Sequence, residues 1–281
     1  RAAVLGYGVE SLPIEAISGA LGAPNMPDTA AVAAAITRAS AMAGARLSRV
    51  CLVVPDSVAR VSIVRFESVP ARTADLDELI KWQVKKTTPF PLDEAVVTYS
   101  QGAASANGHE FIVTVARRDV IGQYEEACER AGAHAGVVDI STFNVVNAVL
   151  AAGHPVAGDW LLVHAAPSYV SLTVLRDGHL IFYRTRGEDS EGSVADLVHQ
   201  TAMYYEDRLK GQHFARVLLA GGSTAAGAEQ LRQELSARLS LEVSAVDPFH
   251  AAAPAESGTL SPALADALAP GIGILLREGA A

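Results

Sequence analysis

The hydrophobic and polar residues between positions 50 and 150 follow one pattern twice, a β-hairpin and then a helix. In the first copy, the β-branched run at residues 50–54 and the looser alternation at residues 58–66 predict two strands around a Pro-Asp turn. The helix predicted after them covers residues 75–86, because its apolar side chains recur at helical spacing. Trp82 points away from that apolar stripe, and prolines beyond the helix prevent its continuation.

The second copy begins with a hairpin predicted from residues 96–99 and 110–115. The helix after it, at residues 120–131, has the most regular apolar periodicity in the chain, and Gly132 ends it. Residues 142–150 are predicted to form a further helix. The alternation of strands and helices indicates an α/β protein.

A different order of elements is predicted from residue 159 onward. Residues 160–163 form a continuous apolar run, which is typical of a strand buried on both faces. Alternating residues on either side of the Asp177-Gly178 turn add two strands and complete a three-strand meander. The elements predicted after it are a helix at 193–209, a strand at 217–220, a helix at 228–239, a strand at 241–243 and a last helix at 262–276.

The composition indicates a globular protein. The chain has 281 residues, 50% hydrophobic and 19% charged, enough for a substantial core. Its net charge of −9 argues against nucleic acid and against broad adhesion to anionic lipid. Cys51 and Cys128 lack metal or redox spacing, as in a reduced, cytosolic protein. No apolar run approaches the ~20 residues of a membrane span, so we expect a soluble protein.

Motifs for catalysis or metal binding do not stand out. The sequence has no Walker loop, no Rossmann glycine fingerprint and no G-x-S-x-G elbow, and its eight histidines lack ligand spacing. We therefore assign no catalytic residue and no metal ligand from motifs.

Five short phrases, read in order, point to a family instead. They are KTTPFPL at 86–92, ARRDV at 116–120, VVDISTF at 137–143, DPF at 247–249 and LAPGIG at 268–273. Together with the order of elements, they resemble the type IV pilus assembly protein family PilM. This family belongs to the actin-like ATPase superfamily and is related to the cell-division protein FtsA and to the cytoplasmic domain of GspL.

The resemblance implies an actin-like (ribonuclease H-like) α/β fold of two lobes with an inserted ββα-type subdomain. Residues 1–155 would form the first lobe, with the insert at about 50–136, and residues 156–262 the second lobe. Residues 263–281 would be a C-terminal helix that returns to the first lobe. Residues 4–9 would then be the third strand of the first-lobe meander, so we expect the natural protein to begin two strands earlier.

Members of the family bind ATP and Mg²⁺ between the lobes, through an Asp-hydrophobic-Gly turn followed by Thr or Ser. A carboxylate there holds Mg²⁺ through water, and bare glycine N–H groups approach the phosphate. In this chain His164 stands in the place of the Asp, Ala166 in the place of the Gly, and Val170 near the expected Thr. The resemblance therefore implies a degenerate nucleotide site.

Four residues remain as candidate nucleotide contacts. Ser168 lies in the phosphate turn, and Gly221, Gly222 and Ser223 stand where relatives hold the ribose and adenine. The alternative is a strand-to-helix turn that needs glycine torsions, with Ser223 as the helix N-cap. We favour this structural reading because the phosphate turn is altered.

A candidate partner site combines Trp82, Lys86 and Phe90. The two aromatic side chains would leave apolar surface in a groove near the insert, suited to an incoming peptide. The alternative is that they pack between insert and lobe. The resemblance implies the cytoplasmic N-terminus of an inner-membrane partner similar to PilN, which would hold the protein at the inner face of that membrane.

Three functions follow as hypotheses. The first is a cytoplasmic scaffold of a type IV pilus machine with a degenerate nucleotide site, a pseudo-ATPase that works by contact. The second is an active actin-like ATPase of the same machine that tolerates His164. The third is the cytoplasmic domain of a type II secretion protein similar to GspL.

Overall fold

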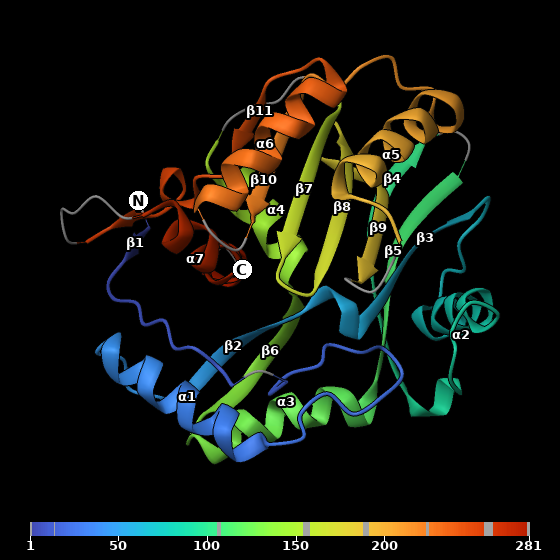
Figure 1. Ribbon diagram of the computed structural model, residues 1–281. Coiled ribbons are helices and arrows are strands. Elements are labelled where there is room, and N and C mark those ends of the chain that lie inside the picture. Colours follow the sequence, from blue (N-terminus) through green and yellow to red (C-terminus); the bar gives the residue numbers. More distant parts are fainter. Residues whose placement is uncertain are drawn as a thin grey trace.

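The computed structural model describes residues 2–13, 15–105, 108–153, 158–187, 191–222, 225–255 and 261–279. Its second half is built on a five-stranded sheet with the order β11-β10-β7-β8-β9 (Figure 1). The strands are β7 (Trp160–Ala166), β8 (Tyr169–Arg176), β9 (His179–Gly187), β10 (Arg216–Gly221) and β11 (Val243–Ala245). Strands β7 to β9 form the predicted antiparallel meander, and β10 and β11 continue the sheet in parallel.

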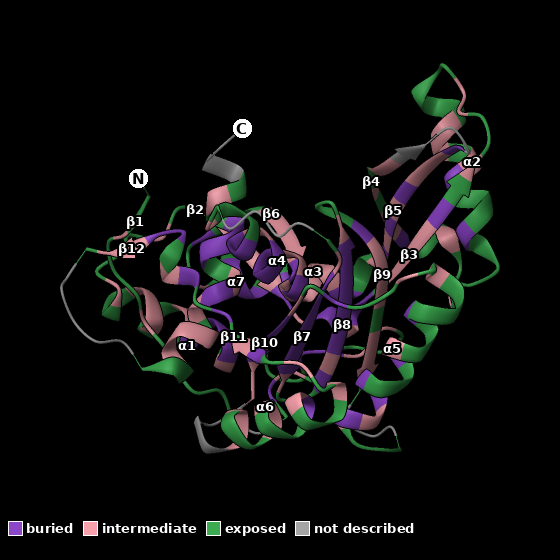
Figure 2. Cartoon of the chain, turned by 90° about the horizontal axis from the view of Figure 1, so that it is seen from above, coloured by how far each residue is buried: buried purple, intermediate pink, exposed green. Residues whose placement is uncertain are grey.

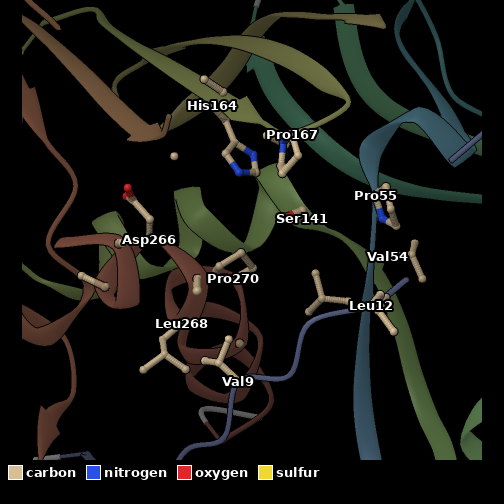
Figure 3. Close-up of a pocket in the computed structure, with 18 of the residues that line it drawn as sticks. Val9, Leu12, Val54, Pro55, Ser141, His164, Pro167, Asp266, Leu268 and Pro270 are labelled. Carbon is tan, nitrogen blue, oxygen red and sulfur yellow. The ribbon is translucent and has the colours of Figure 1, made fainter. Parts of the chain in front are cut away.

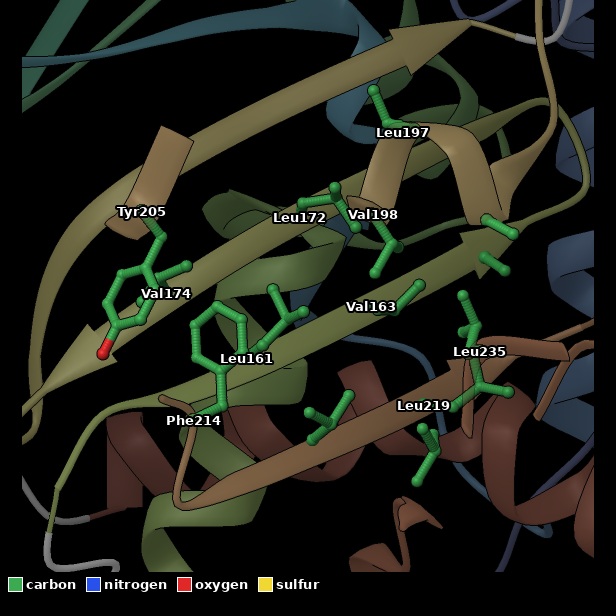
Figure 4. Packing of buried hydrophobic residues seen from close by; sticks show 14 residues of the cluster. Leu161, Val163, Leu172, Val174, Leu197, Val198, Tyr205, Phe214, Leu219 and Leu235 are labelled. Atoms are coloured by element: carbon green, nitrogen blue, oxygen red, sulfur yellow. The ribbon is translucent and has the colours of Figure 1, made fainter. Parts of the chain in front are cut away.

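Both faces of this sheet are covered, as the continuous apolar run in β7 predicts. Leu161 and Val163 pack under two helices on one face (Figure 4), and Trp160 and Leu162 belong to the core on the other face. The first face is covered by α5 (Val194–Leu209) and α6 (Ala225–Leu239), the second by α4 (Ser141–Ala151) and α7 (Pro262–Gly279).

The hairpin predicted from residues 50–54 and 58–66 is wrong. Strand β2 (Arg49–Val54) pairs in parallel with β6 (His134–Ile140), whereas β3 (Ala59–Phe66) joins a different sheet. The short 3-10 turn η1 (Asp56–Val58) separates β2 from β3. The side chain of Asp56, the first residue of η1, is buried and accepts a hydrogen bond from Ser171 in the second half of the chain. This contact directs β3 away from β2.

A three-stranded antiparallel sheet with the order β3-β5-β4 forms the right-hand arm in Figure 1. The predicted second hairpin is confirmed, because β4 (Ala95–Ser105) pairs with β5 (Gly108–Arg117). Helix α2 (Thr73–Lys85) packs Ile80 and Val84 against this sheet, and the turn η2 (Leu92–Glu94) leads into β4. This arm lies within residues 50–136, the range expected for the insert.

Two helices complete the first half. Helices α1 (Thr29–Met42) and α3 (Arg118–Arg130) share a core with the β2–β6 pair, in which Val32, Val54 and Tyr124 are buried. Helix α3 lies where the apolar periodicity of residues 120–131 predicts it.

The N-terminal segment differs from the predicted third meander strand at residues 4–9. Only β1 (Ala3–Val4) is a strand, and it pairs with β12 (Ala253–Pro254), which follows the turn η3 (Pro248–His250). Leu5 and Val9 beyond it are 86% and 55% exposed. Among the residues that the structure describes, β2 and β6 have no third strand beside them.

None of the helices in the described ranges is long and apolar enough to cross a lipid bilayer.

Candidate functional site

A cavity of about 1570 Å³ lies where the two halves of the chain meet (Figure 3). The carboxyl ends of β7 and β10 open into it, and α7, β2 and the N-terminal segment close it. Such an edge is the usual ligand position in open α/β sheets. Away from these strand ends, the cavity is lined mainly by apolar side chains, among them Val9, Leu12, Val54 and Leu268.

The predicted phosphate turn is a tight hairpin between β7 and β8. Ala166 pairs with Tyr169, so that Pro167 and Ser168 form the whole turn, and Ser168 is exposed at the cavity wall. Val170 does not reach this cavity and lines a smaller one of about 360 Å³. The turn therefore contains no glycine, and the residue near the expected Thr offers no hydroxyl group.

His164 lines the large cavity but is almost fully buried, and one of its ring nitrogens is engaged within the fold (Figure 3). It is 6% exposed, and its Nδ1 lies 2.7 Å from the Thr142 hydroxyl at the start of α4. Burial lowers the pKa of His164 below its usual range, and the nearby Asp56 carboxylate opposes part of that shift. The imidazole is therefore neutral at pH 7, and it is held by a hydrogen bond within the fold.

Asp56 joins the two halves of the molecule through a buried carboxylate. Its side chain, 0% exposed, accepts hydrogen bonds from the Thr142 N–H at 2.9 Å, from the Thr142 hydroxyl and from the Ser171 hydroxyl of β8 at 2.6 Å. Ser171 is in turn 2.8 Å from the Thr185 hydroxyl of β9. We call Asp56, Thr142, His164, Ser171 and Thr185 the Asp56 network.

The sequence reading treated Asp56 only as a turn residue and missed this network. Its members are separated by up to about 130 positions, so no local pattern connects them. The sequence does offer one signal, an acidic residue just beyond a strand that is predicted to be buried. A carboxylate that is buried there needs hydrogen-bonding partners.

The glycine pair after β10 has a backbone explanation. Gly221 and Gly222 have φ angles of 83° and 117°, which side chains rarely allow. A Cβ on Gly221 would overlap the Ala165 carbonyl oxygen, and one on Gly222 would come within 2.7 Å of Ala228. Gly221 lines the large cavity and Gly222 the smaller one, whereas Ser223 lies outside the described residues.

The charged side chains around the large cavity are mostly acidic, which disfavours the binding of a polyphosphate. Of the wall that the structure describes, Arg232 is the only lysine or arginine, and Glu229 already pairs with it at 2.7 Å. Asp247 and Asp266 add negative charge, and burial raises the pKa of Asp266. The described residues contain no group of three or more His, Cys, Asp or Glu side chains that would hold a metal ion. The described wall therefore offers a polyphosphate no unpaired lysine or arginine.

The candidate partner residues lie far from this cavity. Helix α2 is at the end of the molecule opposite β1 and β12 (Figure 2). Trp82 is 65% exposed and Lys86 is exposed just after the helix, whereas Phe90 is half-buried against the core of the insert. The structure thus brings Trp82 and Lys86 to one surface, and none of the three residues lines either cavity.

The chain matches a known family over most of its length. The model of the type IV pilus assembly protein PilM matches residues 3–193. The solved PilM-PilN type IV pilus biogenesis complex superimposes with a TM-score of 0.78 and 16% identity, covering 96% of this chain and 90% of that chain. A comparison with curated protein sequences finds no match.

Two other solved structures are more distant. A protein with actin-like ATPase fold and unknown function from Bacteroides thetaiotaomicron gives a TM-score of 0.44 at 12% identity, over 73% of this chain and 70% of that chain. The cytoplasmic domain of EpsL, from the type II secretion system of Vibrio cholerae, gives 0.46 at 10% identity, over 70% and 68%. On the match to more than half of its residues, the chain belongs to the type IV pilus assembly protein PilM family, with the mixed α/β actin-like ATPase fold of that family.

Proposed function

We propose that this protein is a cytoplasmic scaffold of type IV pilus assembly that works by contact with an inner-membrane partner similar to PilN. Membership of the PilM family carries the proposal. The similar fold in the PilM-PilN complex, which extends over 96% of this chain, supports it. The partner would hold the protein at the inner face of the inner membrane.

The cleft supports a pseudo-ATPase rather than an active enzyme. The expected metal-holding acid is replaced by a buried, neutral His164, and the described cavity wall adds acidic side chains rather than free cations. Titration calorimetry of the full chain with Mg²⁺-ATP tests this part of the proposal. We expect no binding up to millimolar nucleotide, and micromolar, Mg²⁺-dependent binding would show a working ATP site.

The lobe assignment forms part of the same proposal, with residues 1–155 as the first lobe, 156–262 as the second and 263–281 as a helix that returns to the first. Close packing of α7 on α4, where Gly273 has no room for a side chain beside Asn144, supports the returning helix. The range expected for the insert, about 50–136, has its own sheet in β3, β4 and β5, and among the described residues β2 and β6 pair only with each other.

We place the partner's peptide on the outer side of α2, at Trp82, Lys86 and Phe90. An exposed tryptophan beside a partly covered phenylalanine offers apolar surface that water solvates poorly. Peptide recognition concentrates its free energy in such aromatic residues.

Fluorescence anisotropy with a labelled peptide from the cytoplasmic N-terminus of the PilN-like protein tests this site. Trp82→Ala is expected to weaken binding by at least tenfold, the effect of an aromatic anchor worth about 2 kcal/mol. Tyr204→Ala is a matched control, because Tyr204 is also exposed, at 46%, but lies on α5. Equal affinities for wild type and Trp82→Ala would remove the peptide from this surface.

A further inference from the structure

The lysines of this chain are concentrated at one place. Of its 22 lysines and arginines only four are lysines, at positions 81, 85, 86 and 210. Three of the four therefore lie within six residues, at the C-terminal end of α2, next to one of the two tryptophans. All three are exposed.

Lysines and arginines have different surroundings in the structure. Within the described part of the chain, no ion pair to an acidic side chain involves a lysine. The arginines that form such pairs are Arg38, Arg65, Arg117, Arg130, Arg176, Arg232, Arg238 and Arg277. Arginine suits these fixed partners because its planar group meets a carboxylate with two N–H donors. The α2 lysines instead direct their charge to the outside of the molecule.

Helix geometry divides the outer side of α2 into two rows. Residues four apart lie on one side of a helix, so Lys81 and Lys85 form one row. Trp82 and Lys86 form the next row, about 100° further round the helix. The acidic residues of α2 lie in its first half, where Asp77 accepts a hydrogen bond from the Tyr99 hydroxyl. The second half of the helix is thus cationic.

The shape of this surface selects the kind of partner. Helix α2 projects from the end of the insert (Figure 2), and neither cavity reaches it. A peptide that is read by its acidic side chains needs a groove with several donors, whereas a projecting cationic helix fits a flat anionic surface. The negative charge elsewhere does not prevent this, because salt screens charges more than about 10 Å apart.

We propose that Lys81 and Lys85 contact the anionic phospholipid headgroups of the membrane. The inference rests on the proposed function for the presence of that membrane. A partner anchored in the bilayer presents its cytoplasmic peptide close to the headgroups. The Trp82 row would hold the peptide while the adjacent lysine row contacts lipid, so that each site strengthens the other through effective concentration.

Vesicle co-sedimentation of the full chain tests the proposal, with phosphatidylcholine vesicles compared with vesicles of phosphatidylcholine and phosphatidylglycerol in equal parts. We expect weak, salt-sensitive partitioning that requires phosphatidylglycerol. Lys81→Gln/Lys85→Gln should reduce it roughly 30-fold, the effect expected for two surface lysines. Lys81→Arg/Lys85→Arg should retain it. Lys210→Gln is the matched control, because Lys210 is exposed but lies at the end of α5.

Binding of the free partner peptide in solution separates this inference from the proposed function. Lys81→Gln/Lys85→Gln should bind the peptide as wild type does, and Trp82→Ala should partition onto vesicles as wild type does. Three outcomes would overturn the lipid assignment. The first is equal partitioning of the wild type onto both kinds of vesicle, and the second is an equal loss of partitioning in Lys210→Gln. The third is a double lysine variant that loses peptide binding but keeps lipid binding. Failure of the wild type to bind peptide would instead refute the proposed function. Thermal unfolding confirms that each variant is folded.

Discussion

The Asp56 network and the outer side of α2 are both polar, but their polar groups differ in whether they have partners within the protein. In the network every member has a protein partner, and three members, Asp56, Thr142 and Ser171, are 0% exposed. On α2 the lysines and Trp82 face solvent. Hydrogen bonds within the fold already engage the side chains of the network, whereas the side chains on α2 are accessible to another molecule.

This difference separates a site that joins the two halves of the chain from a surface that is open to a partner. A bound nucleotide would bridge two lobes by accepting hydrogen bonds from both. Here a carboxylate from the turn after β2 accepts them from α4 and from β8. The described residues leave only the buried hydroxyls of Ser57, Thr173 and Thr201 without a partner, and none belongs to the network. The contrast supports a protein that acts through its surface.

The largest expected effect follows from removing the buried carboxylate. Asp56→Ala removes the acceptor that Thr142 and Ser171 share and leaves the Thr142 N–H buried and unpaired, so the free energy of unfolding should fall by about 3 kcal/mol. Urea unfolding measures this change. Asp93→Ala, at an exposed position, is the control and should stay within about 0.5 kcal/mol of wild type. Equal stability of the two variants would mean that the network does not hold the halves together.

Gly221→Ala should have the next largest effect. Its φ of 83° and its contact with the Ala165 carbonyl predict a loss of about 2 kcal/mol even without ligand. The control is Gly122→Ala, because Gly122 lies within α3 with nothing near its added methyl group, and alanine there should stabilise the helix by up to about 1 kcal/mol. Unchanged stability of Gly221→Ala would contradict the structural reading of this glycine.

A smaller effect is expected from pH. The unfolded chain protonates His164 near its ordinary pKa of 6.5, whereas the folded chain does so only at lower pH. Protons therefore bind preferentially to the unfolded state. The free energy of unfolding should decrease as pH falls below 6.5 towards the lowered pKa, by at most about 1.4 kcal/mol per pH unit. Urea unfolding at several pH values tests this, and the slope should flatten in His164→Gln. A slope that survives the substitution must come from other groups.

The smallest effect on stability is expected on α2. Trp82→Ala should change the free energy of unfolding by less than about 0.5 kcal/mol, because Trp82 is 65% exposed. Ile80→Ala, two residues away and 0% exposed, should cost about 3 kcal/mol. Thermal and urea unfolding of the pair would reveal whether Trp82 belongs to the core. A large loss in Trp82→Ala would favour the alternative in which it packs between insert and lobe.

The sequence predicts the elements of the second half closely because their signals are local. Helix α5 begins directly after the Ser193 N-cap and ends at Leu209, and the run in β7 is buried on both faces. Strand β11 shows the limit of this precision, since the pattern predicts it at residues 241–243 and it is found at Val243–Ala245. Strand ends depend on pairing, which the sequence pattern does not record.

The errors in the first half share one cause. Residues 50–54 and 58–66 are strands, yet each pairs with a partner more than 40 residues away, because Asp56 is held by Thr142 and Ser171. Apolar alternation reports that a residue is half-buried, but not what covers it. The same limit hid the Asp56 network, whose side chains meet only after both halves have folded.

The sequence by itself determined the family, the order of most strands and helices, and the position of Trp82 off the apolar stripe of α2. These follow from neighbouring residues or from the order of short phrases. Only the tertiary structure decided that His164 faces Thr142, that Asp56 bonds to both halves and that Phe90 is partly covered while Trp82 is not. The physical reason is that hydrogen bonding and burial depend on distances in space, which a linear pattern does not contain.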